Sequence, residues 1–541
     1  MRPNPTRRRV KLTAALTGLV LLSGLTACSG GAGDTRAANT QPLTVAAYSQ
    51  PTLQPNFNPF SVNALRGTIG LIYEQLFDFN TAHTGEFMPS LVTKYTWGTG
   101  GKAIDLALDN RAKWADGSAL TADDVIFTFG YLKQHELLAL PVDKVTRTAD
   151  GVHVTFTKPA YAAIQDLGRT VIVPKKIWAG KDPDTDTNVQ PMGSGPYSLG
   201  QVTGQQATFK ARADYWKQQV PVPQITYVTT SSTNLLTQQL VRHEIDLAYA
   251  GIPDVKNQFV QRSPAQNHLW PIYASMKPLM LNLKRKPFDN VHVRKGIALA
   301  IDRQAVTDAY NPGVYQPVGP TGLYQGTWSS WIAPADRDPV KPDQAAALAE
   351  LAQAGYKQQG GKLIGADGKQ LKLRILTVSS FADGMAYTQE LAGQLAALGI
   401  DAAVNGVPSA AYTGDEDKRD FDAIYGDAFT FGTNPYTFYN KMLSKKSKTN
   451  VVGWDDPATE SALGALAQAA PDAQLAASKP LQQIMLTQLP VIPVAVKGTP
   501  YMYNTEHWTG WPSADDPYTT PDPGAISGVF AAKLFLSLKP A

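Results

Sequence analysis

Sulfur and imidazole ligands are scarce in this sequence. Its 541 residues include one cysteine and seven histidines, and the histidines are scattered rather than paired at metal-ligand spacing. A single cysteine excludes a disulfide framework and every multi-cysteine zinc or iron–sulfur site. A bound metal would need oxygen ligands, and we expect the chain to carry neither a metal ion nor a cofactor.

Motifs that indicate a catalytic site are also missing. Gly193-Ser194-Gly195 lacks the G-x-S-x-G spacing of a nucleophile elbow, and the sequence has no H-E-x-x-H, P-loop or dinucleotide fingerprint. His243 beside Glu244 resembles an acid–base pair, but neighbours in a strand point to opposite faces. We therefore predict that the protein is not an enzyme, and an extracellular hydrolase is kept as a distant alternative.

Acidic residues are absent from the first 27 positions, which carry five basic ones. The basic run is followed by an apolar stretch, residues 12–25, that is too short to span a bilayer comfortably. This pattern predicts a signal peptide over residues 1–27, with Sec and twin-arginine export both open. Removing it changes the formal net charge from +4 to −1, and a nearly neutral chain has no electrostatic footprint for nucleic acid.

The only cysteine follows this segment directly. Leu25-Thr26-Ala27-Cys28 resembles the lipobox of bacterial lipoproteins, in which the cysteine is acylated and becomes the first residue. Residues 29–39 are small, polar and Gly-rich, as in a flexible tether. We predict a lipidated tether over residues 28–40 that holds the protein on the outer face of the cytoplasmic membrane. The alternative is a buried free cysteine beside an ordinary cleavage site.

The remaining chain predicts a mixed α/β protein of two or three packed domains, since it is long, 43% hydrophobic and without internal repeats. Residues 104–108 and 152–156 alternate as strands. Thr121 and Asp124 form a capping box that opens a helix through about His135.

The second half contains a strand–helix–strand pattern. Residues 371–378 and 400–407 are predicted strands, and residues 384–398 form an amphipathic helix that ends at Gly399. This βαβ unit predicts a right-handed crossover onto a parallel sheet. Further helices are expected over 291–310 and over 342–355, the latter with Pro342 at its first position.

Four motifs then resemble family 5 solute-binding proteins of ABC importers, the peptide and nickel group. Together they cover most of the chain after the tether, and they occur in the family's order. They are the W-x-D-G-x-x-x-T-A-x-D-V pattern from Trp114 to Val125, the turn from Pro191 to Tyr197, the segment from Glu244 to Ala248, and the helix from Pro287 to Arg303.

The resemblance implies a two-lobed periplasmic-binding-protein-like fold of type II with an extra domain, mixed sheets flanked by helices, and a hinge between the lobes. The implied boundaries are residues 41–80, 188–270 and 498–541 for domain I, 81–187 for domain II, and 271–497 for domain III.

The family's peptide anchor is replaced in this chain. In the oligopeptide-binding members an aspartate in a W-x-A-D-Y-x-x-P context pairs with the ammonium of the peptide. Here the aspartate position holds Phe431 and the tryptophan position holds Ala428. A buried ammonium without a counter-charge is costly, so either Asp427 takes over this role or the ligand has no α-amino anchor.

Five aromatic residues occur in the eleven positions from 429 to 439, more than a strand needs for one buried face. Core packing explains them equally well, but neutral hydrogen-bonding groups among flat rings also suit a sugar. Trp328 and Trp331 are added as stacking platforms or as a hydrophobic cluster. The candidate ligand-binding residues are Tyr48, Trp328, Trp331, Asp427, Phe429, Thr430, Phe431, Asn434 and Tyr436.

The resemblance therefore predicts a monomeric substrate-binding lipoprotein that delivers an extended solute to ABC permease subunits with a cytoplasmic ATPase. An oligopeptide comes first because most of the family is associated with peptides. The alternative is a cello-type oligosaccharide, since residues 508–518 resemble a branch associated with such ligands. Nickel or haem has no histidine cluster to support it.

Overall fold

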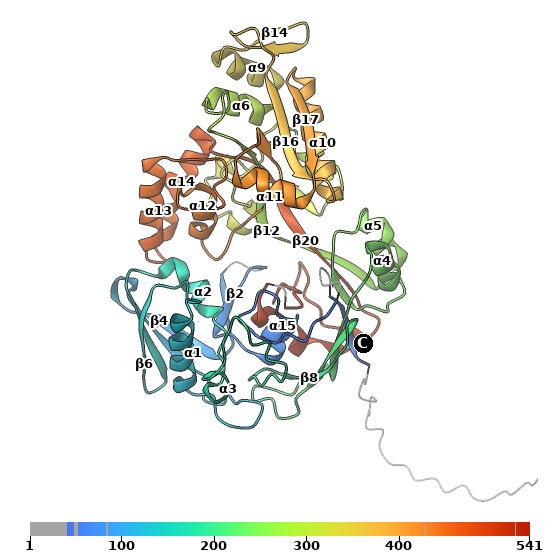
Figure 1. Ribbon diagram of the computed structural model, residues 1–541. Coiled ribbons are helices and arrows are strands. Elements are labelled where there is room, and N and C mark those ends of the chain that lie inside the picture. Colours follow the sequence, from blue (N-terminus) through green and yellow to red (C-terminus); the bar gives the residue numbers. More distant parts are fainter. Residues whose placement is uncertain (1–40, 48–51, 83–84, 427, 525) are drawn as a thin grey trace, which may run out of the picture. The chain divides into compact units, whose positions relative to one another are not determined.

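The largest sheet in the computed structural model is a mixed sheet of twelve strands (Figure 1). The structure describes residues 41–47, 52–82, 85–426, 428–524 and 526–541. The predicted signal peptide, Cys28, the tether, Tyr48 and Asp427 lie outside these residues. Within them, no helix combines the length and the hydropathy that a bilayer crossing requires.

Two long antiparallel strands form the centre of this sheet. β12 (Asn267–Leu281) pairs with β20 (Ile492–Asn504) from Asn267 opposite Asn504 to Leu279 opposite Ile492. The predicted domain boundaries at 270/271 and 497/498 fall inside these two strands, and the domain division itself stays a prediction.

The other strands flank this central pair in the order β17-β16-β18-β12-β20-β11-β1-β10-β9-β8, with β13 on β20 and β19 on β12. Their bounds are β1 Leu43–Ala46, β8 Tyr197–Val202, β9 Gln206–Ala211, β10 Gln224–Val228, β11 Leu247–Tyr249, β13 Tyr315–Pro317, β16 Lys372–Val378, β17 Asp401–Val407, β18 Ala423–Ile424 and β19 Phe429–Thr430.

A separate four-stranded antiparallel sheet has the order β4-β5-β7-β6, with β4 Val92–Trp97, β5 Ala103–Leu108, β6 Val142–Arg147 and β7 Gly151–Phe156. Helix α1 (Ala122–Gln134) packs on it, and the predicted capping box is present. The Thr121 side chain accepts from the Asp123 N–H, and the Asp124 carboxylate accepts from the Thr121 N–H at 3.0 Å. The first-half predictions for 104–108, 152–156 and this helix are therefore confirmed.

The predicted βαβ unit is also confirmed. β16 and β17 pair in parallel from Lys372 opposite Asp401 to Val378 opposite Val407, and α10 (Ala382–Ala397) connects them and packs on both. Gly399 has φ of +103°, the left-handed conformation expected after the helix.

Two helix predictions need correction. The single helix over 291–310 is two helices, α6 (Val291–Ala300) and α7 (Arg303–Asp308), because the Asp302 carboxylate accepts from the N–H groups of Gln304 and Ala305 and starts a new helix. Helix α9 (Gln344–Gln353) begins after Asp343, whose side chain caps it, so Pro342 is not its first residue.

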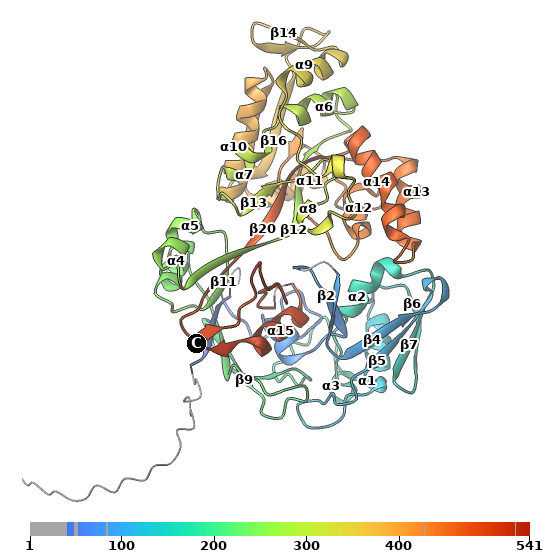
Figure 2. The ribbon, with the colours of Figure 1, turned by 180° about the vertical axis from the view of Figure 1, so that it is seen from behind.

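The remaining elements surround these sheets (Figures 1 and 2). The helices are α2 Ile164–Gly168, α3 Lys175–Trp178, α4 Thr233–Val241, α5 Val255–Gln258, α8 Gln325–Trp328, α11 Ser409–Asp417, α12 Pro435–Leu443, α13 Pro457–Gln468, α14 Gln474–Gln488 and α15 Gly528–Ser537. The short strands are β2 Phe77–Asn80, β3 Glu86–Pro89, β14 Lys357–Gln359, β15 Lys362–Ile364, β21 Trp508–Thr509 and β22 Lys539–Pro540.

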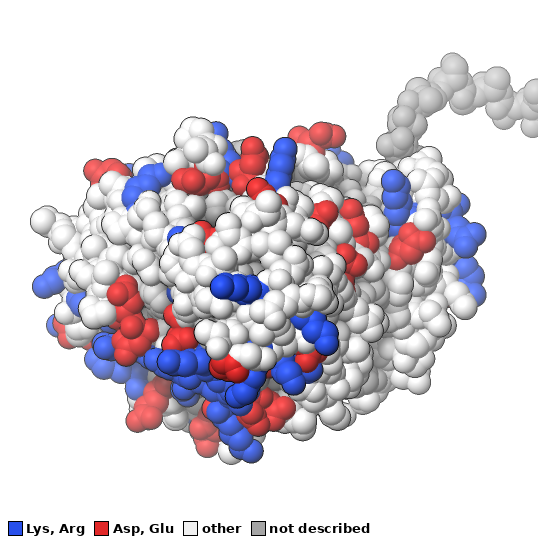
Figure 3. All heavy atoms as spheres, turned by 90° about the horizontal axis from the view of Figure 1, so that it is seen from above, with Lys and Arg blue, Asp and Glu red and all other residues white. Residues whose placement is uncertain are grey.

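Charged side chains of both signs share the molecular surface. On the face in Figure 3, basic side chains that gather together have acidic ones beside them. Oppositely charged side chains of the described chain also form ion pairs, such as Arg285 with Asp420 at 2.7 Å and Arg374 with Asp401 at 3.1 Å. This mixing agrees with the small formal charge that the sequence has after residue 27.

Candidate functional site

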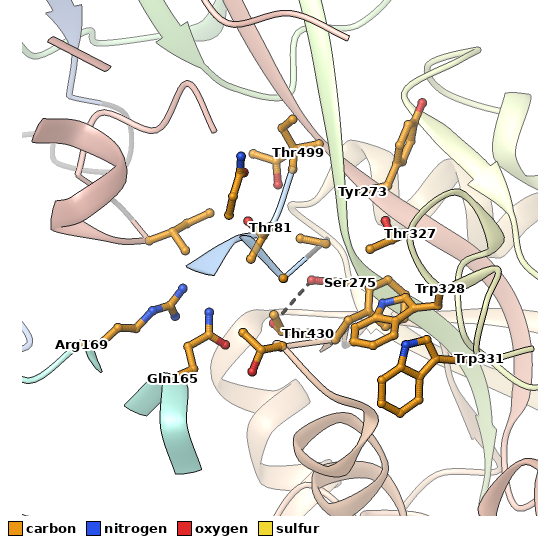
Figure 4. Close-up of a pocket in the computed structure, with 18 of the residues that line it drawn as sticks. Thr81, Gln165, Arg169, Tyr273, Ser275, Thr327, Trp328, Trp331, Thr430 and Thr499 are labelled. Atoms are coloured by element: carbon orange, nitrogen blue, oxygen red, sulfur yellow. Dashed lines mark hydrogen bonds between the residues drawn. The ribbon is translucent and has the colours of Figure 1, made fainter. Parts of the chain in front are cut away.

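A cavity of about 380 Å³ lies beside the middle of β12. Figure 4 shows Arg169 and Gln165 on one side of it and Trp328 and Trp331 on the opposite side. Its lining comes from chain segments more than 400 residues apart: Asn80, Thr81, Gly85, Gln165, Arg169, Ile272, Tyr273, Ala274, Ser275, Thr327, Trp328, Ser330, Trp331, Thr430, Phe431, Gly432, Thr433, Thr499 and Ile526.

An irregularity in β12 positions one wall of this cavity. The register with β20 shifts between Tyr273 and Ser275, so Ala274 has no partner residue in β20. Its carbonyl instead accepts a hydrogen bond from the Phe431 N–H at 3.0 Å. Ser275 pairs with Thr430 in β19, and their hydroxyls are 3.5 Å apart. The bulge thus holds the 430–433 segment over β12.

The aromatic segment divides between the cavity and the core. Thr430 and Phe431 line the cavity, whereas Phe429 is buried away from it. The segment is a strand only at Phe429–Thr430, and α12 begins at Pro435, so Tyr436 lies on a helix. Asn434 caps that helix by accepting from the Tyr436 N–H at 2.9 Å. The five aromatic residues are therefore divided between a short strand, the loop after it and a helix.

Phe431 is only 3% exposed, although its side chain borders the cavity. Its ring centroid is 5.2 Å from that of Phe438, which is completely buried in α12. The ring thus belongs both to the hydrophobic core and to the cavity wall.

The two candidate tryptophans both line the cavity. Their rings are 5.3 Å apart and cross at 78°, with Trp328 buried and Trp331 partly exposed. The Trp331 carbonyl accepts hydrogen bonds from Lys479 Nζ at 2.7 Å and from Gln482 Nε2 at 3.0 Å, both on α14. These contacts fix the backbone of the more exposed indole.

Arg169 is the charged side chain in the described lining of this cavity. Its charge is balanced by Asp78, a buried residue outside the lining. Asp78, which is fully buried, accepts from Arg169 Nε at 2.8 Å, from Gln165 Nε2 at 3.0 Å and from its neighbour's backbone N–H at 2.7 Å. Among the lining residues that the structure describes, none carries a carboxylate. The cavity wall is therefore dominated by neutral groups.

Serine and threonine are the most numerous polar residues of the lining: Thr81, Ser275, Thr327, Ser330, Thr430, Thr433 and Thr499. Sequence reasoning missed most of these residues, together with Gln165 and Arg169. They lie in segments without a motif, and only the folded chain brings them together.

His243 and Glu244, the neighbours that resemble an acid–base pair, do not line this cavity. His243 and Glu244 follow α4 in a turn, not in the strand that was expected, and His243 has φ of +55°. The His243 ring contacts the Glu506 carboxylate and Asn267 Oδ1, while Glu244 pairs with Arg242 at 2.8 Å. In the described part of the chain, no cluster of three metal-ligating side chains occurs.

The family of the chain follows from its sequence. Residues 86–450 match the profile described as "Bacterial extracellular solute-binding proteins, family 5 Middle". The chain belongs to this family. It is therefore an extracytoplasmic solute-binding protein of the ABC importer type, and the family is one of substrate-binding proteins, not of enzymes.

Relatives are similar over most of their length. The probable peptide-binding protein YejA of Agrobacterium fabrum is 25% identical over 84% of this chain and 86% of its own. Protein XP55 of Streptomyces lividans is 26% identical over 85% of this chain and 84% of its own. The oligopeptide-binding protein AppA of Bacillus subtilis is 26% identical over 69% of this chain and 71% of its own.

Solved structures show the same fold. A periplasmic oligopeptide-binding protein of Thermotoga maritima aligns with a TM-score of 0.82 at 23% identity, covering 93% of this chain and 100% of that chain. The mannohexaose-bound structure of that protein aligns with a TM-score of 0.73 at 24% identity, covering 93% and 99%. The predicted periplasmic-binding-protein fold is confirmed, with its large mixed sheet flanked by helices.

Proposed function

We propose that this family 5 protein is a lipoprotein, anchored through Cys28, that captures an extended solute in the cavity beside β12. It then delivers the solute to ABC permease subunits served by a cytoplasmic ATPase. The support is the family membership together with a cavity of about 380 Å³, a size typical of small-molecule sites.

An oligosaccharide is the solute that the cavity suits best. The observation that carries this proposal is the mostly neutral lining, with seven serine and threonine side chains, two indoles and one arginine that Asp78 already neutralises. Indole faces pack on the apolar faces of sugar rings, and the hydroxyl and amide groups bond to sugar hydroxyls. The Thermotoga maritima protein with the same fold has been crystallised with mannohexaose.

An oligopeptide is the second candidate. The names of YejA and AppA associate those relatives with peptides. A peptide needs a counter-charge for its ammonium, and Asp427 is the residue that we propose for it if the ligand is a peptide. The lining that the structure describes supplies no carboxylate, and this supports our choice of the oligosaccharide as the first candidate.

A thermal-shift panel separates the two candidates. Purified protein without its first 27 residues is heated with di- to hexapeptides and with cello-, xylo-, malto- and manno-oligosaccharides. A ligand at 100 times its dissociation constant adds about 2.7 kcal/mol to the free energy of unfolding, which raises the melting temperature measurably. We expect a rise with one oligosaccharide series. A rise in melting temperature with peptides alone would make the oligopeptide the first candidate.

A further inference from the structure

A smaller cavity of about 200 Å³ lies against α15, outside the solute cavity beside β12. It is bordered by β3, by the 215–217 segment that follows β9, and by α15. Helix α15 packs against β2 in both ribbon views (Figures 1 and 2). The two cavities have no described lining residue in common, so a ligand in the smaller one would not be part of the captured solute.

Part of the lining of the small cavity is apolar. Met88 of β3 and Val529 of α15 are buried and pack with Phe530 in a hydrophobic cluster separate from the larger ones. Leu536, two turns further along α15, also lines the cavity. At about 30 Å³ for each water molecule, the space would hold roughly six or seven waters. It therefore suits a small molecule with an apolar body and excludes an oligomer.

A buried carboxyl group belongs to the same lining. Glu74 is 2% exposed and accepts hydrogen bonds from Tyr215 Oη at 2.8 Å and from Trp216 Nε1 at 3.1 Å. Both donors are neutral. Burial raises the pKa of Glu74, although Lys217 opposes this shift. A cationic group bound beside Glu74 would stabilise its carboxylate and offset the cost of burial.

Two ammonium groups line the cavity as well. Lys217 Nζ donates to the Pro89 carbonyl at 3.2 Å, and Lys533 is an exposed residue of α15. Burial lowers the pKa of Lys217; Glu74 opposes this shift, and the positive charge of Lys533 adds to it. An anionic group bound near both lysines would relieve their mutual repulsion.

The charges of the described lining balance, with two acidic residues, Glu74 and Glu86, and two basic residues, Lys217 and Lys533. A ligand that carries one charge of each sign matches this arrangement better than a simple anion or cation does. A small apolar body between such charges completes the match, since the remaining lining includes the apolar residues of β3 and α15.

We propose that this cavity is a binding site for a free amino acid with an apolar side chain of about the size of leucine. Its α-ammonium group pairs with the Glu74 carboxylate, and its α-carboxylate pairs with Lys217 and Lys533. Its side chain packs on Met88 and Val529. The site is separate from the solute cavity, and the proposal holds whichever solute that cavity takes.

Calorimetric titration with three small molecules tests the proposal. L-leucine carries both charges, 4-methylpentanoate lacks the ammonium group, and L-leucinamide lacks the carboxylate. We expect leucine to bind at one site per chain. Each analogue should bind at least tenfold more weakly, because each loses a charge-assisted contact in a site that is largely shielded from water.

Two variants assign the charges to residues. Glu74→Gln keeps the shape of the side chain and should weaken leucine binding at least tenfold while leaving the affinity for 4-methylpentanoate unchanged. Lys533→Ala should weaken binding of leucine and of 4-methylpentanoate, but not of leucinamide. Lys539→Ala is the matched control, since this exposed lysine lies just after α15 and lines neither cavity, and it should change none of the affinities.

The titrations can overturn the proposal in three ways. Leucine may fail to bind, or it may bind no better than 4-methylpentanoate, which would remove the role of Glu74. Leucine binding that is unchanged in Lys533→Ala would place the amino acid elsewhere in the protein. Because Lys533 is exposed, this variant should fold normally and decides the question even if Glu74→Gln does not fold.

Discussion

Phe431 occupies the position at which the sequence resemblance implies a charged anchor. A phenyl ring cannot neutralise an ammonium, but it can pack on an apolar face of a ligand. The structure places this ring between the cavity and Phe438, so its loss affects both folding and binding.

Phe431→Ala is therefore expected to weaken ligand binding by about 1–3 kcal/mol through lost apolar and stacking contact. It should also lower the free energy of unfolding by about 3–5 kcal/mol, the usual range for removing a buried phenyl ring. Titration calorimetry and urea unfolding measure the two effects. Phe431→Leu retains most of the buried volume and should recover much of the stability.

Asp427→Asn is the companion change that tests charge. With a neutral oligosaccharide it should cost little, and added salt should hardly alter affinity. If Asp427 pairs with a peptide ammonium, the same change should abolish peptide binding, because it removes a charge-assisted hydrogen bond from a desolvated site. Loss of peptide binding in Asp427→Asn, together with a small effect of Phe431→Ala, would show that the ligand is a peptide.

A buried carboxyl group gives the stability a pH dependence. Glu74 is 2% exposed and accepts hydrogen bonds from Tyr215 Oη at 2.8 Å and Trp216 Nε1 at 3.1 Å. Burial raises its pKa above the usual 4.5, although Lys217 and these hydrogen bonds oppose the shift. Between pH 4.5 and the raised pKa, the folded protein holds a proton that the unfolded chain releases, so raising the pH destabilises the fold.

Glu74→Gln should remove this contribution. We expect the melting temperature of the variant to fall less than that of the wild type as the pH is raised from 5 to 7. Differential scanning calorimetry across this range provides the measurement. Parallel curves for the two proteins would show that Glu74 does not titrate differently in the folded and unfolded states.

Among the elements, those with complete local signals were predictable. The helix after Thr121 has its own capping box. The βαβ unit has a segment of helical period that ends at Gly399 and lies between two predicted strands. The break after α6 was missed because residues 291–310 are apolar at helical spacing on both sides of it. It depends on Asp302, whose capping bonds and backbone contacts with Gln394 are visible only in the fold.

Asp302→Ala should therefore destabilise the start of α7. The Asp302 carboxylate accepts from Gln304 N at 3.0 Å and from Ala305 N at 3.1 Å, and removing a cap of this kind costs about 1 kcal/mol. The urea midpoint should fall accordingly, with an unchanged slope. Asp302→Asn keeps an accepting oxygen at the same place and should retain nearly all of the stability.

At the scale of the whole molecule, the sequence motifs identified the fold but located only part of the cavity. Trp328, Trp331, Thr430 and Phe431 were predicted because aromatic and hydroxyl residues cluster there. Gln165, Arg169 and Thr499 come from distant segments, and no local pattern links them. Their meeting depends on the bulge at Ala274 and on the pairing of β12 with β20, which are tertiary features.

Anchoring through Cys28 makes a prediction that does not depend on the ligand. Acyl chains stabilise membrane attachment by about 0.8 kcal/mol per buried CH₂ group, so a multiply acylated cysteine holds the protein firmly. Cys28→Ser should move the protein from the membrane fraction to the soluble extracytoplasmic fraction, with ligand affinity unchanged. Equal membrane partition of both proteins, measured by fractionation and immunoblotting, would contradict the lipid anchor.

Ligand capture should also change the dimensions of the molecule. The first cavity is lined by residues of all three predicted domains, from Thr81 and Arg169 in domain II to Phe431 in domain III and Thr499 in domain I. A solute that contacts all of them binds best when these surfaces approach one another, and its differential affinity then favours the closed arrangement. β12 and β20 cross the predicted boundaries between domains I and III, so bending of this strand pair is the motion that we expect.

Small-angle X-ray scattering tests this expectation directly. The radius of gyration should fall when the ligand found in the thermal-shift panel reaches saturation, and tryptophan fluorescence should change over the same concentration range because Trp328 and Trp331 line the cavity. The Trp331→Ala variant at its own saturating concentration should still compact, since closure depends on several surfaces rather than on one ring. An unchanged radius of gyration at full occupancy of the wild type would show that the solute is bound without domain closure.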